Sequence, residues 1–459
     1  MKTIFSWSLT LIYAVIAYLF VFGILSYKVH YEMPNDITYD ISAFTELSVN
    51  PQYAYLVEER LLAFDIRLAL INHAQESIDI SYYAIHEGLS KEVFFGALLE
   101  AADRGVNIRF IIDGFIEGRG FNDAESMSVL SNHPNIDVAY YEVFSITAPF
   151  AVQNRLHDKL MIVDQTYGLI GGRNIGDRYY FDEDDIDKKT HDRDVLIFGE
   201  HAQAVEDMSD YFDYLFNHPY SDIIDNELPS HHTNRYITIY QDYISDRELE
   251  LPTIMTDVYN DAFLVKNVTF MRSPLNRMHK EPVIFNALLE LSRNYNDIII
   301  QSPYVIFSRP MRQMLAEYDL DNITLLTNHP YTNPNILAVS GYLRIRQDLA
   351  ESTTLYEYQK PLSLHTKTLI FGDEISVIGS INIDPRSAYL STESVVVIYD
   401  EAFNTYMRSV IDTYLEDSLE VNGDLRYNEG TIEPIEYSQS RVILARIMKF
   451  LTYFFDEML

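Results

Sequence analysis

The chain has 459 residues and no cysteine, and its 34 Lys and Arg against 68 Asp and Glu give a formal net charge of −34. The lack of cysteine excludes disulfides, thiolate metal sites and a cysteine nucleophile. The negative charge argues against broad binding to nucleic-acid backbones, although a small basic pocket for one phosphate remains compatible with it. A hydrophobic fraction of 47% and a charged fraction of 22% are typical of a folded chain with two or three domains.

An uncharged apolar segment opens the chain. Residues 4–25 lie between Lys2 and Lys28 and contain no charge, and a stretch of this length can cross a bilayer as a helix. A cleaved signal peptide and a buried core helix are the alternatives, but the residues around Gly23 form a poor cleavage site. We therefore predict an uncleaved, single-pass anchor in a cell membrane. The N-terminal amine and Lys2 slightly favour an extracytoplasmic body.

The next residues, 29–50, contain prolines and scattered acids and are predicted to be a linker. Strand and helix patterns then alternate in two places, which is typical of an α/β fold. The predicted elements are strands at 77–83 and 106–113 around a helix at 91–104, and strands at 297–304 and 322–327 around a helix at 310–318.

The sequence allows two interpretations for each of two further segments. The acidic run 182–187 is a solvated loop or, less simply, a calcium site. The C-terminal stretch 441–459 has apolar residues at helical spacing and three cations, so it lies on a membrane surface or packs on the body. Its apolar positions are Ile443, Ile447, Phe450, Leu451, Phe454 and Met458, and its cations are Arg441, Arg446 and Lys449.

Two short stretches of the chain repeat each other. The first reads LHDKLMIVD followed by GGRN, and the second reads LHTKTLIF followed by GSIN. The pairs His157 and His365, Lys159 and Lys367, Gly171 and Gly379, and Asn174 and Asn382 are all separated by 208 positions. Identical separations at four polar or special positions indicate two duplicated halves of about 200 residues. We predict a first domain at 51–230, a second at 231–425, and a C-terminal amphipathic segment at 426–459.

The spacing within each motif indicates a catalytic role. Residues i and i+2 of a strand point to the same face, so His157 projects with Lys159 and His365 with Lys367. If the halves pack about a pseudo-twofold axis, one pocket holds both pairs. One imidazole can then attack an electrophile while the other protonates the leaving group. The lysines, with Asn174, Asn382, Ser380 and Gly172 as further candidates, would bind the oxygens of a phosphate. No metal or other cofactor is required.

A nucleophilic histidine needs a partner that holds its other ring nitrogen. Asp192 and Glu393 lie at comparable places downstream of the two motifs, each before an apolar strand, and are candidates for this role. Asp194 competes with Asp192. For each residue taken singly, a structural role is the simpler interpretation, and only the doubled pattern favours catalysis. Arg173 and Arg386 are also explained by supporting ion pairs.

At these residues the sequence resembles the phospholipase D superfamily, which is marked by two HxKx4D…G[GS]xN motifs. The stretches IGGRNIGDRYY, GSINIDPRS and AVSGYLRIRQDLAESTTLYEYQ are similar to those of bacterial cardiolipin synthases, especially the type C subgroup. The resemblance covers roughly residues 50–425. It implies two phospholipase D-like α/β halves packed as a pseudo-dimer within one chain, so that oligomerisation is not needed for the chemistry.

The resemblance also implies a function, the transfer of a phosphatidyl group through a phosphatidyl-histidine. By analogy, His157 is the nucleophile and His365 the acid and base, with phosphatidylglycerol as donor and phosphatidylglycerol or phosphatidylethanolamine as acceptor. The motif Asp is Asp164 in the first half. Gly372 stands at the matching position of the second half, and Asp373, one place later, is a candidate replacement.

Three other functions compete with this interpretation. A phospholipase D hydrolase would use the same residues with water as acceptor. A nuclease of the superfamily is disfavoured by the apolar N-terminal segment and the net charge, since nucleic-acid substrates require basic surfaces. A non-catalytic scaffold is disfavoured because both His-x-Lys pairs are intact.

Overall fold

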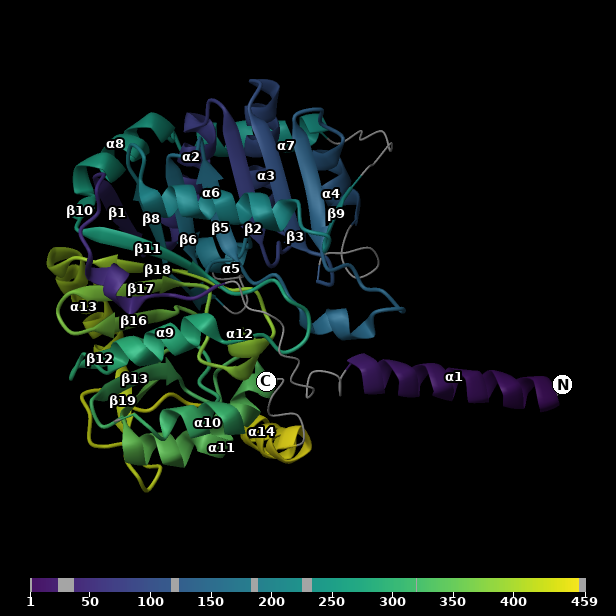
Figure 1. Ribbon diagram of the computed structural model, residues 1–459, viewed down its shortest axis with the longest axis vertical. Helices are drawn as coiled ribbons and strands as arrows, with labels where there is room; N and C mark the ends of the chain where they lie inside the picture. The colour runs from purple at the N-terminus through teal and green to yellow at the C-terminus, as the bar shows by residue number, and fades with distance from the viewer. Residues whose placement is uncertain are drawn as a thin grey trace.

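The computed structural model describes residues 2–23, 37–116, 124–182, 189–224, 233–318 and 320–453 (Figure 1). Two mixed β-sheets, each covered by helices, form the body of the protein. The first sheet has the order β10 (Phe263–Val265), β1 (Gln52–Val57), β8 (Asp194–Phe198), β6 (Tyr167–Gly171), β5 (Lys159–Val163), β2 (Ser77–Tyr82), β3 (Asn107–Asp113), β4 (Ile136–Tyr141) and β9 (Ser221–Ile223). The second has the order β11 (Asn267–Arg272), β18 (Ser394–Tyr399), β17 (Ile375–Gly379), β16 (Thr368–Phe371), β12 (Ile298–Gln301), β13 (Ile323–Asn328), β14 (Thr354–Tyr358) and β19 (Ser418–Val421).

The two sheets share one topology. From β1 to β9 and from β11 to β19, strands of matching role follow in the same order, and β10 is an addition at the edge of the first sheet. The central strands β2, β3 and β4 run parallel, as do β12, β13 and β14. The predicted duplicated α/β halves are therefore confirmed, and the predicted strand–helix–strand units are present in both.

Helices cover the outer faces of both sheets, and α6 and α13 lie between the sheets. Those of the first half are α2 (Arg60–His73), α3 (Leu89–Asp103), α4 (Ala124–Ser131), α5 (Asp177–Tyr180), α6 (Gln203–Phe216), α7 (Thr233–Asp246) and α8 (Leu251–Asp261). Those of the second are α9 (Val283–Ser292), α10 (Arg309–Leu315), α11 (Ile336–Ser352), α12 (Pro385–Tyr389), α13 (Glu401–Glu416) and α14 (Gln439–Leu451). Short 3₁₀ helices lie at η2 (Ile41–Thr45) and η3 (Pro149–Gln153).

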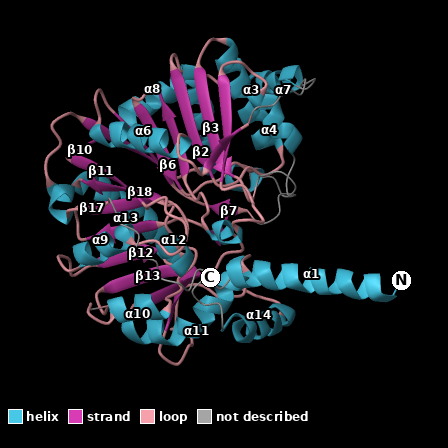
Figure 2. Ribbon diagram, turned by 45° about the vertical axis from the view of Figure 1, so that its right-hand side comes forward, coloured by secondary structure: helices cyan, strands magenta, loops and turns pink. Residues whose placement is uncertain are grey.

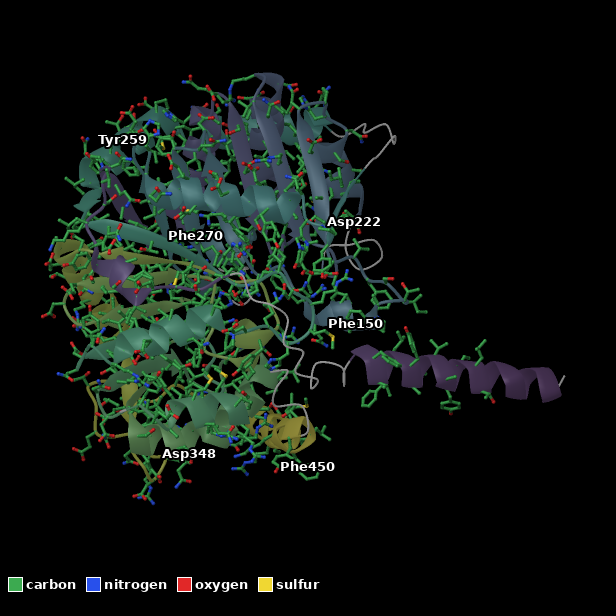
Figure 3. All side chains as sticks on the ribbon, viewed as in Figure 1. Phe150, Asp222, Tyr259, Phe270, Asp348 and Phe450 are labelled. Carbon is green, nitrogen blue, oxygen red and sulfur yellow. The ribbon has the colours of Figure 1, made fainter. Side chains whose placement is uncertain are left out.

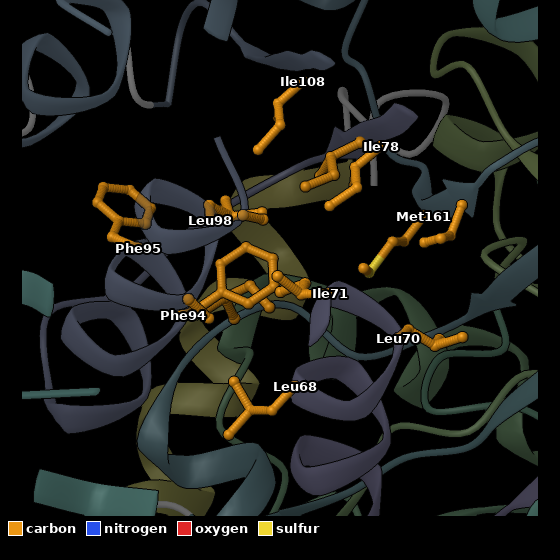
Figure 4. Close-up of a cluster of buried hydrophobic side chains, with 14 of the residues drawn as sticks. Leu68, Leu70, Ile71, Ile78, Phe94, Phe95, Leu98, Ile108 and Met161 are labelled. Atoms are coloured by element: carbon orange, nitrogen blue, oxygen red, sulfur yellow. The ribbon is translucent and has the colours of Figure 1, made fainter. Parts of the chain in front are cut away.

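The core of the first half lies where α2 and α3 pack on the sheet (Figure 4). Leu68 and Ile71 of α2 and Phe94 and Leu98 of α3 meet the apolar side chains of the central strands, and all are buried. Strands such as β5 are buried along their whole length because helices or the other half cover both faces. A second core, with side chains from α6, α13 and both sheets, joins the halves.

The structure moves the predicted domain boundary. Helices α7 and α8 pack on α3 and α2, and β10 pairs with β1, so residues 233–265 belong to the first half. At Gly96 of α3 an added Cβ would lie 2.1 Å from the carbonyl oxygen of Tyr236, which shows how closely α7 approaches. The chain passes to the second sheet at β11 rather than near residue 230. Part of the predicted linker also packs on the second half, where Ile37 and Phe44 join its core.

The N-terminal segment is helical, as α1 (Lys2–Gly23), and it projects from the body between the halves (Figures 1 and 2). The prediction that it spans a membrane is not supported. A span needs about 20 consecutive apolar residues, and within the described residues no helix is long and apolar enough to cross a bilayer. Two segments were left with alternative interpretations. Residues 183–187 of the acidic run and residues 454–459 of the C-terminal stretch lie outside the described residues.

Candidate active site

The two motif histidines lie where the halves meet. His157 stands just before β5 and His365 just before β16, each at the start of a hairpin that the repeated sequence builds. The backbone N–H of His157 donates to the carbonyl of Thr392 at 3.0 Å, and that of His365 donates to the carbonyl of His191 at 2.7 Å. A two-stranded parallel sheet of β7 (Thr190–His191) and β15 (Ser363–Leu364) also joins the halves, and β7 lies between them in Figure 2. Each histidine is thus held by the other half.

Each imidazole contacts a carboxylate that the opposite half supplies. His157 Nδ1 lies 2.9 Å from Glu393 Oε2, and His365 Nδ1 lies 2.6 Å from Asp192 Oδ2. Both carboxylates are buried. Asp194, the competing candidate, pairs instead with Arg67 and Arg173. The structure therefore places Asp192 and Glu393 against the histidines and leaves Nε2 of each ring to face a substrate.

The residues before the motif asparagines make room for these carboxylates. A Cβ added at Gly172 would lie 2.1 Å from Oδ1 of Asp192, so only glycine allows this approach. The matching residue of the second half, Ser380, donates from Oγ to Glu393 Oε2 at 2.5 Å. Both residues were predicted to bind phosphate. The structure places them instead against the carboxylates that hold the histidines.

The motif lysines are buried beside the histidines. Lys159 Nζ donates to the carbonyl of His157 at 2.5 Å, and Lys367 Nζ lies 2.7 Å from His365 Nδ1 and 3.6 Å from Asp192 Oδ2. Burial lowers the pKa of Lys159 to about 7 and that of Lys367 to about 8. A bound anion would favour the charged forms and raise both pKa values.

Burial also dominates the titration of the histidines. It lowers the pKa of His157 well below its ordinary value, with Lys159 and Lys367 adding to the effect, and it lowers the pKa of His365 to about 3. Because Lys367 lies in the second half, its influence on His157 shows that the two motifs share one electrostatic environment. The neutral form is the one that a nucleophile requires, whereas the histidine that protonates the leaving group must first take up a proton.

The two carboxylates differ in acid strength. Burial raises the pKa of Glu393 to about 7, against the opposing effect of Lys159. Burial acts in the same direction on Asp192, but Lys367 and His365 overcome it and hold the pKa of this group well below its ordinary value. Asp192 therefore stays ionised at neutral pH, whereas Glu393 titrates there. This difference breaks the symmetry of the site.

The motif asparagines face the same region with unused hydrogen-bonding capacity. Asn174 Nδ2 donates to the Tyr179 hydroxyl at 3.2 Å. Within the described part of the chain, Oδ1 of Asn174 and Oδ1 of Asn382 are buried and have no hydrogen-bond partner. Buried polar atoms are rarely left unpaired, so these carboxamides suit a polar ligand.

The motif aspartates are not in this cluster. Asp164 lies at the far end of β5 from His157, with a φ of 49°, and its carboxylate accepts the backbone N–H groups of residues 75–77 at 2.8–2.9 Å. Gly372 has the matching left-handed φ of 54° in the second half. Asp373 is exposed in that turn. Both aspartates were predicted to be catalytic, but they are remote because a whole strand, β5 or β16, runs between them and the motif histidines.

Several site residues were missed by the sequence analysis. Asp113 accepts the N–H of Leu156 at 2.9 Å, and Asn328 accepts that of Leu364 at 2.8 Å, so each fixes the residue before a motif histidine. Both end a parallel strand, a position where functional polar residues often lie. That position was the available signal.

Aromatic rings and a further arginine complete the surroundings. The rings of Tyr83 and His157 lie 5.0 Å apart, and those of Tyr304 and His365 lie 6.2 Å apart. Arg178 of the first half lowers the pKa of His365, and Arg386 of the second lowers that of His157. These arginines are separated by 208 positions, like the motif residues, and this separation could have identified Arg178.

Together these groups provide two imidazoles held by carboxylates, with buried lysines and arginines around them. A tetrahedral anion such as a phosphodiester matches this set, with one imidazole to attack phosphorus and the other to move a proton. The cations would stabilise the negative charge on the phosphoryl oxygens during the transfer.

Comparison with known proteins agrees with this chemistry. Residues 68–216 and 288–415 match the family model described as a cardiolipin synthase, phospholipase D-like domain. The chain is 27% identical over 443 residues to cardiolipin synthase C of Escherichia coli K12, covering 85% of this chain and 90% of the relative. It is 28% identical over 418 residues to an uncharacterized protein of Helicobacter pylori 26695, covering 81% and 82%. Phosphatidylserine synthase of Haemophilus influenzae Rd KW20 shares the fold, with a TM-score of 0.61 and 14% identity over 90% of this chain and 96% of that one.

Proposed function

Because the chain belongs to the cardiolipin synthase family of phospholipase D-like proteins and is a phosphatidyltransferase of this type, we propose that it makes cardiolipin from phosphatidylglycerol and a second phospholipid. The observation that carries the proposal is the pair of buried histidines, each held through Nδ1 by a carboxylate of the other half. This arrangement leaves two Nε2 atoms for the two roles that a double-displacement reaction requires.

In the first step, His157 Nε2 attacks phosphorus of the donor lipid and the bond from phosphorus to the headgroup oxygen breaks. His365, in its protonated form beside the ionised Asp192, gives a proton to that oxygen, so the headgroup leaves as an alcohol and a phosphatidyl-histidine remains. In the second step, His365 takes the proton from the acceptor hydroxyl. That oxygen attacks phosphorus, the phosphorus–nitrogen bond breaks, and His157 is regenerated.

The difference between the carboxylates supports this division of roles. The histidine that carries a proton becomes an imidazolium, which an ionised partner stabilises, and Asp192 beside His365 remains ionised. Lys159 and Lys367, with Arg178 and Arg386, would hold the phosphoryl oxygens.

The chemistry of the headgroups limits the choice of acceptor. Phosphatidylglycerol carries a free hydroxyl and can accept the phosphatidyl group. Phosphatidylethanolamine has an amine but no headgroup hydroxyl, so the expectation that it is an acceptor requires correction. In the proposed reaction it acts as a donor and releases ethanolamine.

The test is lipid mass spectrometry of the full chain in mixed micelles, given phosphatidylglycerol with and without phosphatidylethanolamine, beside His157→Ala and His365→Ala. The proposal expects cardiolipin from the wild type and none from either variant. Release of ethanolamine together with cardiolipin would identify the second lipid as the donor. Phosphatidic acid without cardiolipin would indicate a hydrolase, and no turnover of any lipid would overturn the proposal.

A further inference from the structure

The C-terminal helix α14 has one face on the body and another that is exposed among the residues that the structure describes. Val442 and Ala445 are buried against α11, and Thr452, just after the helix, shares a hydrogen bond of 2.8 Å with Ser340. Lys449 Nζ donates to the carbonyl of Leu343 at 2.6 Å. The packing interpretation of this segment is therefore confirmed for that face, and the orientation of the helix is determined.

The exposed face is a continuous apolar stripe. At about 100° per residue, its side chains fall within an arc of about 120° on the side away from α11. Ile447 lies at its centre, and Phe450, which is 76% exposed, lies at one edge. The stripe consists of Ile443, Leu444, Ile447, Phe450 and Leu451, all of them exposed.

The charge of this helix is opposite to that of the chain. Residues 439–453 contain Arg441, Arg446 and Lys449 and no acid, whereas the whole chain carries −34. Arg446 is exposed and, by the same angular spacing, flanks the stripe. Apolar side chains flanked by cations match the boundary between headgroups and acyl chains of an anionic bilayer.

The stripe lies near the base of α1 and the segment that contacts it, η3. Helix α1 lies close to α14 in both views, and Phe150 and Phe450 lie on either side of its base in Figure 3. At that base Gln153 receives a hydrogen bond from Arg386 at 3.0 Å and donates to the carbonyl of Gly23 at 3.1 Å. Phe144 and Ile146, just before η3, are also exposed.

We propose that the exposed stripe of α14 docks on the surface of an anionic lipid bilayer and holds the active site at the level of the headgroups. This inference rests on the proposed function only in that the substrates are lipids of that bilayer. Docking there would bring the base of α1, and with it Gln153 and its partner Arg386, toward the headgroups of the bilayer.

The lack of cysteine allows a direct test, because a single introduced cysteine can be labelled with an environment-sensitive fluorophore. The probe is placed by Phe450→Cys in one preparation and by Leu264→Cys in the other. Leu264 is 61% exposed in β10, on the opposite side of the molecule from α14 in Figures 1 and 2. Vesicles of phosphatidylglycerol and of phosphatidylcholine are added to the full chain, so that binding through α1 does not by itself change the local signal.

The inference expects a blue shift and a rise in emission at position 450 with phosphatidylglycerol vesicles and little change at position 264. Arg446→Gln should weaken the affinity reported at position 450 about five-fold, and added salt should weaken it further. An equal response to both vesicle types, or no response at position 450, would overturn the proposal. So would a change at 450 that depends on protein concentration without lipid, because a second copy would then cover the stripe.

Turnover by the same labelled preparations in detergent micelles separates the two proposals. Normal turnover with no change at position 450 would overturn the docking surface alone. A blue shift at position 450 without turnover of any lipid would overturn the proposed function alone.

Discussion

At the scale of single residues, Glu393 determines when His157 can act. The ionised carboxylate can only accept the Nδ1–H of His157, which leaves the Nε2 lone pair free for attack, whereas a protonated carboxyl can donate to Nδ1 and place the ring proton on Nε2. Because burial raises the pKa of Glu393 to about 7, we expect kcat/KM in micelles to rise with pH through about 7. From about 7 to above 8, loss of charge on Lys159 and then Lys367 should weaken phosphate binding, so the full profile should be a narrow bell.

A pair of variants tests this assignment. In Glu393→Gln the acidic limb should disappear and kcat/KM should fall about 100- to 10,000-fold, because the amide cannot ionise. In Ser380→Ala the acidic limb should remain but move to higher pH. The Ser380 hydroxyl stabilises the ionised form of Glu393, so its removal should raise the pKa of Glu393. An acidic limb that persists unchanged in Glu393→Gln would show that another group titrates.

The assignment of His157 as nucleophile leads to a second prediction. A donor with a good leaving group, such as phosphatidyl-p-nitrophenol, needs no proton from His365. His365→Ala should therefore release about one equivalent of p-nitrophenol in a burst and gain the mass of a phosphatidyl group, because deprotonation of the acceptor is blocked. His157→Ala should show neither effect. If His157→Ala accumulates the adduct instead, the two roles are reversed.

At the scale of elements, the end of β6 brings Asp192 to its histidine. Gly172 follows this strand, and a methyl group there would lie 2.1 Å from the carboxylate. Gly172→Ala should displace Asp192 from His365 and lower kcat at least 10-fold, with little change in KM because the lysines remain in place. The matched control is Gly423→Ala, where a Cβ meets its nearest neighbour at 3.4 Å, and its kinetics should equal those of the wild type. A wild-type kcat in Gly172→Ala would contradict the prediction, because it would mean that the backbone after β6 can move without displacing Asp192 from His365.

Variants of the motif aspartates should change the stability of the fold without changing catalysis. Asp164 accepts backbone N–H groups that precede β2, so Asp164→Ala should cost about 2–4 kcal/mol in urea unfolding. Asp373→Ala, at an exposed position, should cost less than about 0.5 kcal/mol. Folded Asp164→Ala protein should keep kcat near that of the wild type. A large loss of kcat with unchanged stability would place Asp164 in the reaction after all.

The sequence predicted some of these elements and not others, for physical reasons. The alternation of strand and helix patterns and the constant separation of 208 positions can be read directly from the sequence. They predicted the two halves and both His-x-Lys pairs. Pairing between His157 and Glu393 depends on how the halves dock, which no local pattern records. The boundary near residue 230 was misplaced because α7 and α8 look like any amphipathic helices, and only their packing on α3 and α2 assigns them to the first half.

At the scale of the whole molecule, a negatively charged surface encloses a centre rich in cations. The halves are joined across this centre by Arg193, whose guanidinium pairs with Glu58 and also donates to Gln301 and Thr368 of the second half at 2.8 Å. Neither half alone supplies both a histidine and the carboxylate that holds it. One chain therefore forms one complete site, and the chemistry needs no second copy.

The buried acids and bases of the same centre make opposite contributions to stability as the pH changes. Burial lowers the pKa of the two motif histidines, so their contribution to stability rises with pH up to about 6.5. Burial raises the pKa of Asp384 to about 7 and that of Asp158 to about 6, as it does for Glu393. These carboxyl groups bind more protons in the folded state than in the unfolded state between pH 4 and 7, so their contribution to stability falls as pH rises through this range. The lysines act in the opposite sense at higher pH, because burial also lowers the pKa of Lys280 to about 7 and the unfolded state binds more protons up to about pH 10.

Asp384→Asn should isolate the first effect, because asparagine can still accept the N–H of Ser387 at the start of α12. Relative to this variant, the wild type should lose about 2–4 kcal/mol of stability between pH 4 and pH 7, measured from urea midpoints. Asp348→Asn, at an exposed position on α11, should differ from the wild type by a constant amount across the same range. If the difference for Asp384→Asn were equally constant, Asp384 would be ionised throughout. The carboxyl groups would then not oppose the folding of this site at neutral pH.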